Sequence, residues 1–239
     1  MPDPVSPFLS TRLPIGNRTL EAHANPVTCV LAGRRGPLKL QQGGLRAEGD
    51  LLLVRPGVVH EVALTDQGAD VLYLNGLHFP SDAPLAVALR GPFALSAELA
   101  LRGEPSAVAE VRARLTLRAH KLSARMADVV RAILAEPMRR MSQGELSRRL
   151  GLERTQALRC FKEATGQTFR AFKSWSALQH AAALMVCGEL VRTAAMDAGF
   201  ADTAHLSRVF RWHFGLTPSA AIAGLQLNGR HPPANSAAA

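Results

Sequence analysis

The feature of this 239-residue chain that most constrains its fold is a segment that occurs twice. Residues 159–168 read RCFKEATGQT and residues 208–217 read RVFRWHFGLT, so both fit R-x-F-[K/R]-x-x-x-G-x-T at an offset of 49 residues. Each copy follows a short helical pattern that ends in glycine, at Gly151 and at Gly199. Glycine adopts the positive φ that lets one helix stop and the next start at a steep angle. The repeat therefore predicts two helix-turn-helix units in the C-terminal half.

The residue types within each copy divide between two faces of a helix. Phe161 and Phe210 occupy positions where the second helix of a unit would bury a ring against the first. Arg159 and Arg208 lie two residues earlier and project from a different face. An exposed cationic face on such a helix is typical of proteins that read the DNA major groove. A repetitive helical bundle is the alternative, and the coincidence of repeat, charge and motif disfavours it.

The charge of the chain also favours a polyanionic partner. There are 28 Lys and Arg residues against 19 Asp and Glu residues, and 24 of the 28 cations are arginines. The net charge is +3 over residues 1–125 and +6 over residues 126–239. Arginine forms paired hydrogen bonds with phosphates and with guanine edges, although the same bias also fits a high-GC genome.

Several protein classes are disfavoured by what the sequence lacks. Cys29, Cys160 and Cys187 form no closely spaced pair, so neither a disulfide framework nor a zinc site is predicted. The N-terminus has prolines and an acid where a signal peptide would have a basic start and an apolar core. No apolar run of about 18 residues is present. We therefore expect a cytoplasmic protein without a membrane partner.

The N-terminal half has a different pattern. From Val27 to Leu77, short apolar runs are broken by Gly, Pro and Asp, which predicts strands of a small antiparallel barrel or sandwich. Residues 1–20 are expected to form an irregular arm. After Gly91 the strand signals stop, and apolar residues at helical spacing predict a helix over residues 105–122. That helix is expected either to pack on its own domain or to form a dimer contact.

Residues 126–223 resemble the DNA-binding domain of the AraC/XylS family of transcriptional regulators. The segment AAMDAGFADTAHLSRVFRWHFGLTPS, residues 194–219, is similar to the family pattern of an Ala-containing helix, GF, a recognition helix ending in F-[K/R], and FG-x-TP. The resemblance implies seven helices, with a long helix over residues 168–186 that joins the two units. It also implies that the two recognition helices enter successive major grooves.

The same resemblance implies which side chains face DNA. Arg211 is expected to neutralise a phosphate, while the alternative for Arg208 is an ion pair with Asp202 that only stabilises the helix. Glu153 replaces the family's usual cap, so the second unit is the better candidate for base reading. The complete set of expected DNA-binding residues is Thr155, Leu158, Arg159, Lys162, Thr203, Ala204, His205, Ser207, Arg208 and Arg211.

The segment GDLLLVRPGVVH, residues 49–60, resembles the second cupin motif. The first cupin motif would supply an HxH pair, which this chain lacks, and His23 and His78 are isolated in the sequence. We therefore expect no metal and no cofactor. The resemblance implies a metal-free sensing domain, for which Arg55, His60 and Tyr73 are the candidate effector-binding residues. An inward Arg55 would favour an anionic effector.

These inferences combine into an α+β protein with a cupin-like β-barrel followed by an all-α domain. The expected divisions are a sensing or dimerisation domain over residues 1–91, a helical linker over 92–125, a double helix-turn-helix domain over 126–227 and a disordered tail over 228–239. The predicted function is sequence-specific regulation of transcription, with double-stranded DNA, RNA polymerase, a small effector and a second copy of the chain as partners.

No catalytic pattern stands out in the sequence, so an enzyme is not predicted. Two alternatives remain open. The first is a metal-dependent cupin enzyme with a helical appendage. The second is a DNA-binding protein whose N-terminal domain mediates only protein contacts.

Overall fold

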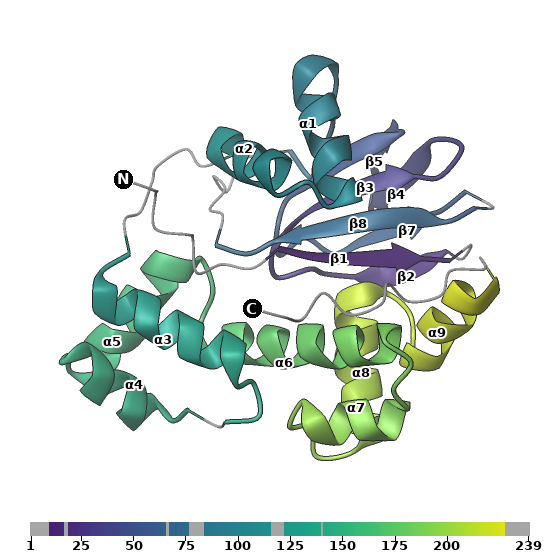
Figure 1. The fold of residues 1–239 in the computed structure, drawn as a ribbon. Coiled ribbons are helices and arrows are strands. Elements are labelled where there is room, and N and C mark those ends of the chain that lie inside the picture. The colour runs from purple at the N-terminus through teal and green to yellow at the C-terminus, as the bar shows by residue number, and fades with distance from the viewer. Residues whose placement is uncertain are drawn as a thin grey trace.

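The computed structural model describes residues 10–16, 19–65, 67–76, 84–115, 122–139 and 141–227. The described residues form an α+β molecule in which a β-sheet half precedes a helical half (Figure 1). The expected disordered tail over residues 228–239 and the isolated His78 lie outside these residues.

Two antiparallel sheets make up the first half of the molecule. Their strand orders are β1-β8-β3-β6-β9 and β2-β7-β4-β5. The expected barrel or sandwich is therefore a sandwich of two sheets, and no ladder of hydrogen bonds among the described strands closes it into a barrel. The strands are β1 (Ser10–Ile15), β2 (Leu20–His23), β3 (Thr28–Gly33), β4 (Leu38–Gln42), β5 (Leu45–Gly49), β6 (Leu51–Val54), β7 (His60–Ala63), β8 (Ala69–Leu74) and β9 (Ala86–Ala88).

Strand β1 shows that the expectation of an irregular arm over residues 1–20 was wrong for residues 10–15. It pairs antiparallel with β8 along its whole length, from Ser10 opposite Leu74 to Ile15 opposite Ala69. The sequence of β1 contains Pro14, which cannot donate to a ladder and is tolerated at a sheet edge. Because β1 forms the edge of the five-stranded sheet, it can contain a proline that hides its strand character in the sequence.

Two helices cover the outer face of the five-stranded sheet (Figure 1). They are α1 (Gly91–Arg102) and α2 (Pro105–Leu115), which contact each other. Val111 of α2 is fully buried in one cluster with Val30 of β3 and Leu72 of β8. Helix α2 thus packs on its own domain, which was one of the two expectations for it. Residues 116–121 of the expected helix lie outside the described residues.

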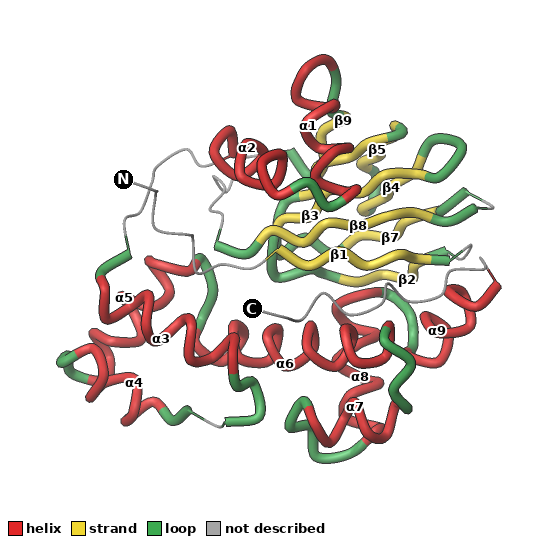
Figure 2. The backbone as a smooth tube through the Cα atoms, viewed as in Figure 1, coloured by secondary structure: helices red, strands yellow, loops and turns green. Residues whose placement is uncertain are grey.

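The second half of the described chain is helical, and its seven helices match the number that the family resemblance implied. Helix α6 runs along the sheet half, with one group of helices at each of its ends (Figure 2). No helix in the described ranges is both long and apolar enough to span a membrane. The helices are α3 (Ala124–Ala135), α4 (Gln143–Leu150), α5 (Arg154–Thr165), α6 (Phe169–Val186), α7 (Val191–Asp197), α8 (Thr203–Phe214) and α9 (Pro218–Leu227).

The two helix-turn-helix units belong to different hydrophobic cores. Phe161 of the first unit packs with Phe169 and Phe172 of α6 in a core formed within the helical half. Phe210 of the second unit belongs instead to a core that also contains residues of both sheets. The first unit is therefore built on helices alone, whereas the second unit is packed against the sheet half.

Trp175 of α6 lies at the centre of the shared core. Its side chain is 1% exposed, and its indole Nε1 donates to Oδ1 of Asn75 at 2.9 Å. The Trp175 ring centroid lies 5.2 Å from that of Tyr73 on β8 and 5.6 Å from that of Phe214 on α8. One aromatic residue thus connects the sheet half, the joining helix and the second unit.

Candidate DNA-binding surface

The first unit consists of α4 and α5, and side-chain caps fix both helix starts. Oγ of Ser142 accepts from the Glu145 backbone N–H at 3.0 Å at the start of α4. Gly151 ends α4 with a φ of 68°. The Glu153 carboxylate then accepts from the backbone N–H of Thr155 at 2.8 Å, and this bond lowers the pKa of Glu153. Glu153 therefore caps the N-terminus of α5, as the residue usual in the family would.

The expected DNA-binding residues of the first unit lie on α5 in two environments. Thr155, Arg159 and Lys162 are exposed, so their polar groups are available to a partner. Leu158 is partly buried and packs against the core of the first unit. The Arg159 guanidinium lies 3.9 Å from the Glu163 carboxylate, and both side chains are largely exposed, so solvent screens this pair.

The second unit consists of α7 and α8, with Gly199 between them at a φ of 79°. Asp202 caps the start of α8, since its Oδ1 accepts from the His205 backbone N–H at 2.6 Å. Phe210 is buried, with its ring centroid 4.5 Å from that of Phe214. The opposite face of α8 is left to solvent.

Most of the expected DNA-binding residues of the second unit lie on that open face. Thr203, Ala204 and His205 are exposed in the first turn, and Ser207 is partly buried. Arg208 is exposed, and no ion pair joins it to Asp202 in the described part of the chain. Asp202 acts as a helix cap, which leaves the Arg208 guanidinium available to a partner.

Arg211 has an intramolecular partner that the sequence did not predict. Its Nε and Nη2 atoms donate to Oε2 of Glu21 on β2 at 2.8 and 2.6 Å. Both side chains are more than half exposed, so the pair contributes at most about 1 kcal/mol to stability. The residue expected to neutralise a DNA phosphate is thus bound to a carboxylate of the sheet half.

The ion pair is one part of a contact between β2 and the C-terminal end of α8, called here the β2–α8 contact. Backbone N–H groups of Glu21 and Ala24 donate to the carbonyls of Gly215 and Trp212 at 2.9 and 3.1 Å. Nδ1 of His213 lies 2.9 Å from the carbonyl oxygen of Ala24. These bonds fix the end of the second recognition helix to the edge strand of the four-stranded sheet.

Replacing Gly215 with alanine should destabilise the protein more than the same change at Gly188. Both glycines have positive φ, +70° and +96°, so each substitution costs about 1 kcal/mol in backbone strain. A Cβ at Gly215 would also lie 2.5 Å from the Glu21 carbonyl oxygen, whereas Gly188 has open space. We expect an additional loss of about 1–3 kcal/mol for Gly215→Ala in urea unfolding. Equal losses for the two variants would contradict the β2–α8 contact.

Three histidines gather at the same contact. The ring centroids of His23 and His60 lie 4.4 Å apart, and His213 approaches from α8. Burial, together with the neighbouring His60 and His213, lowers the pKa of His23 to about 4, although its bond to the Glu21 carbonyl acts in the opposite direction. Burial also lowers the pKa of His60 and of His213. Folding therefore favours neutral rings at this contact.

Stability should fall as the pH drops below 6.5, because the unfolded chain then binds protons that the folded histidines do not. The contribution of His23 is fully present above its unfolded pKa of 6.5 and is lost as the pH approaches 4. For His23 alone we expect a loss of about 2 kcal/mol between pH 7.5 and pH 5, measured by urea unfolding. The His23→Gln variant should show a smaller loss, and an equal loss in the variant would contradict this origin.

The three candidate effector residues do not share the cavity that lies between the sheet half and the helical half. Tyr73 is 3% exposed and lines a cavity between the sheet half and the helical half. His60 is buried and its Nδ1 lies 2.8 Å from the Val58 carbonyl oxygen. Neither His60 nor Arg55 lines that cavity. No cluster of three His, Cys, Asp or Glu side chains suited to a metal occurs within the described ranges.

Comparisons with known proteins agree with this geometry. Residues 146–223 match a family model described as a helix-turn-helix domain, and this range runs from within α4 through the second unit. The C-terminal half of the chain therefore contains a helix-turn-helix domain of the AraC type. Domains of this kind bind DNA, which favours a DNA-binding regulator over the alternative of a cupin enzyme.

Solved structures extend the likeness of fold to more than nine tenths of the chain. ToxT from Vibrio cholerae O395 aligns with a TM-score of 0.57 at 15% identity, over 91% of this chain and 98% of that chain. ToxT bound to (E)-4-(8-methylnaphthalen-1-yl)but-3-enoic acid aligns with a TM-score of 0.59 at 14% identity, over 91% and 99%. Wild-type ToxT from Vibrio cholerae strain SCE256, bound to an unsaturated fatty acid, gives 0.56 at 14%, over 95% and 98%. A search of curated proteins finds no match.

The structure contains long-range contacts that the sequence did not indicate. Glu21 contacts Arg211 across 190 positions of the chain, and Asn75 contacts Trp175 across 100. The isolated histidine His23 lies beside His60 because β2 and β7 pair. No local spacing indicates such contacts, since each depends on how the two halves of the chain are packed together.

Proposed function

We propose that this regulator reads a specific double-stranded DNA sequence with α5 and α8 in successive major grooves. The exposed cationic face of α8 is the observation that carries this proposal, because Arg208 is exposed and Asp202 is engaged in capping. Thr203, Ala204, His205 and Ser207 would complete the base-reading face of the second unit. In major grooves, an arginine fork pairs with guanine O6 and N7.

The first unit is proposed to contribute mainly backbone affinity. Thr155, Arg159 and Lys162 are exposed on α5, where they could contact phosphates or bases. Leu158 is turned partly into the core, so its contribution would be an apolar contact at most. Two units of unequal readout would give a binding site with one strongly specified half and one weakly specified half.

We also propose that a small effector modulates the regulator through its N-terminal half. Two observations support this: the fold is similar to that of ToxT, which has been solved with a small organic acid and with an unsaturated fatty acid, and a cavity lies between the two halves of this chain. Tyr73 is the candidate effector residue that lines the cavity. The other candidates, Arg55 and His60, would act only if a second site exists.

Further partners follow from the class of regulator. RNA polymerase and a second copy of the chain are proposed partners, and the compartment is proposed to be the cytoplasm, where bacterial-type regulators meet DNA. The domain divisions at residues 91, 125 and 227 are proposed on the same resemblance. No covalent chemistry is proposed, since the matched family model and the fold are those of a regulator.

Selection of bound sequences from random DNA tests the proposal. The full chain should enrich one motif, with a strongly specified half assigned to α8 and a weaker half assigned to α5. A pool that stays random after repeated rounds at physiological salt would contradict sequence-specific binding. Thermal shifts with small molecules would then separate a sensing domain from one that mediates only protein contacts.

A further inference from the structure

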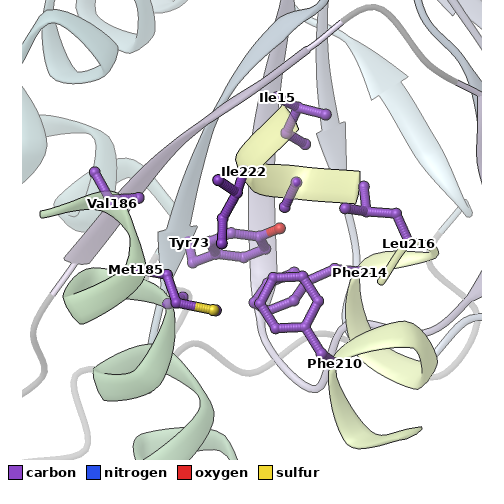
Figure 3. A pocket seen from close by; sticks show the side chains of 10 residues that line it. Ile15, Tyr73, Met185, Val186, Phe210, Phe214, Leu216 and Ile222 are labelled. Carbon is purple, nitrogen blue, oxygen red and sulfur yellow. The ribbon is translucent and has the colours of Figure 1, made fainter. Parts of the chain in front are cut away.

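A cavity lies where the sheet half meets the second helix-turn-helix unit. Its walls come from β1, β8, α6, α8 and α9, and its empty volume, part of which opens to solvent, is about 480 Å³. Figure 3 shows the side chains that surround it, with the Tyr73 ring next to that of Phe214, at a centroid distance of 5.6 Å.

The walls of the cavity are apolar. Apart from Tyr73, every lining residue is aliphatic, aromatic or methionine, and no charged side chain of the described residues lines the space. Burial, and then the neighbouring Cys29, raises the pKa of Tyr73, so its hydroxyl stays neutral. The described residues provide no hydrogen-bond partner for that hydroxyl. The cavity therefore offers an apolar surface and one hydrogen-bonding side chain, that of Tyr73.

We propose that this cavity binds an uncharged, apolar small molecule that forms one hydrogen bond with the Tyr73 hydroxyl. This inference rests on the proposed effector control and names the chemical class of the effector. A carboxylate against these apolar walls would lose part of its hydration, and the described lining residues offer no cation to compensate, which is unfavourable. The site would thus differ from the expectation of an anionic effector at Arg55.

The position of the cavity connects its occupant to DNA binding. Phe210 and Phe214 form one wall, and they belong to the same helix as the exposed Arg208. The β2–α8 contact holds the end of that helix at Arg211. A molecule in the cavity would therefore contact the buried face of α8. The opposite face of the same helix is the one proposed to contact DNA.

Titration calorimetry of the full chain with 1-octanol and with octanoate tests the proposal. We expect saturable 1:1 binding of octanol and at least tenfold weaker binding of octanoate, because the two probes differ mainly in charge. The Tyr73→Phe variant keeps the ring and removes the hydroxyl, and should weaken octanol binding by about two- to tenfold. Absence of saturable octanol binding, or octanoate binding that is equally tight, would overturn the proposal.

Two variants at alanine positions control for non-specific alcohol effects. Ala221→Phe places a ring in the cavity wall and should abolish octanol binding, whereas Ala109→Phe changes an exposed residue of α2 and should preserve it. Equal octanol binding in the two variants would overturn the proposed location. DNA binding without ligand is measured separately on the selected site, so a failure of the ligand proposal can be distinguished from a failure of DNA recognition.

Discussion

Replacing Trp175 with alanine should lower the free energy of unfolding by about 3–5 kcal/mol, the largest loss expected from a single substitution in this chain. The side chain is almost fully buried and contacts Tyr73 and Phe214 across the junction of the two halves. The substitution also removes the hydrogen bond to Oδ1 of Asn75 and leaves that buried acceptor with one bond fewer. Urea unfolding followed by circular dichroism measures the loss.

The second tryptophan of the chain provides a matched control. Trp212 is 62% exposed on α8, so Trp212→Ala should change the free energy of unfolding by less than about 0.5 kcal/mol. Trp175→Ala should in addition broaden the transition, because the helical half would lose its attachment to the sheet half. A small effect at Trp175, similar to that at Trp212, would contradict the shared core.

Replacing Arg208 with alanine should weaken binding to the selected DNA site by about 1–3 kcal/mol and relax the preference at one base pair. Arg208 is exposed and unpaired with Asp202, so its guanidinium can reach a guanine edge. Fluorescence anisotropy on the selected site and on single-base variants measures both effects. If the loss were even over all variants while the fold stayed intact, Arg208 would not be a base-reading residue.

Arg211 provides the contrast with Arg208. If it neutralises a phosphate, Arg211→Ala should weaken all sequences alike and lower the salt slope by about one. Glu21→Gln removes the carboxylate that binds Arg211 in the free protein, so it should strengthen binding to every sequence by up to about fivefold. Unchanged affinity in both variants would show that Arg211 serves the β2–α8 contact alone.

Local sequence patterns were sufficient to predict the double helix-turn-helix unit. Gly151 and Gly199 mark the ends of the first helices, and both have the positive φ that the pattern requires. Ser142 caps the start of α4, since its Oγ accepts from the Glu145 backbone N–H. Such features depend on residues within a few positions of one another, which is why a single sequence reveals them.

Strand pairing at the sheet edges could not be predicted in the same way. β1, β2 and β9 lie outside the region in which strands were predicted, because they are short or contain polar residues or proline, and their pairing depends on distant strands. Whether two sheets join into a closed barrel or remain a sandwich depends on hydrogen bonding between their edge strands. No short stretch of the sequence determines that pairing. Helix α1 was not predicted as a separate helix, because its residues fell within the expected helical linker over residues 92–125. Its N-terminal proline, Pro92, is nevertheless a residue type that favours the first turn of a helix.

The contacts between the sheet half and the helical half also could not be predicted from the sequence. Trp175 was expected only as part of the long joining helix, and no role was predicted for Glu21. Their contacts with Asn75 and Arg211 arise from tertiary packing alone. The candidate effector residue Tyr73 acquires its place in a cavity for the same reason.

The measurement that tests sequence-specific recognition most directly is the ratio of two dissociation constants at about 0.15 M salt. One is measured on the selected DNA site and the other on a shuffled duplex of the same composition. A regulator that reads bases with α8 should bind the selected site roughly a thousandfold or more tightly. A ratio near one, with affinity for both duplexes falling alike as salt rises, would show that the chain holds only the DNA backbone and would contradict the account.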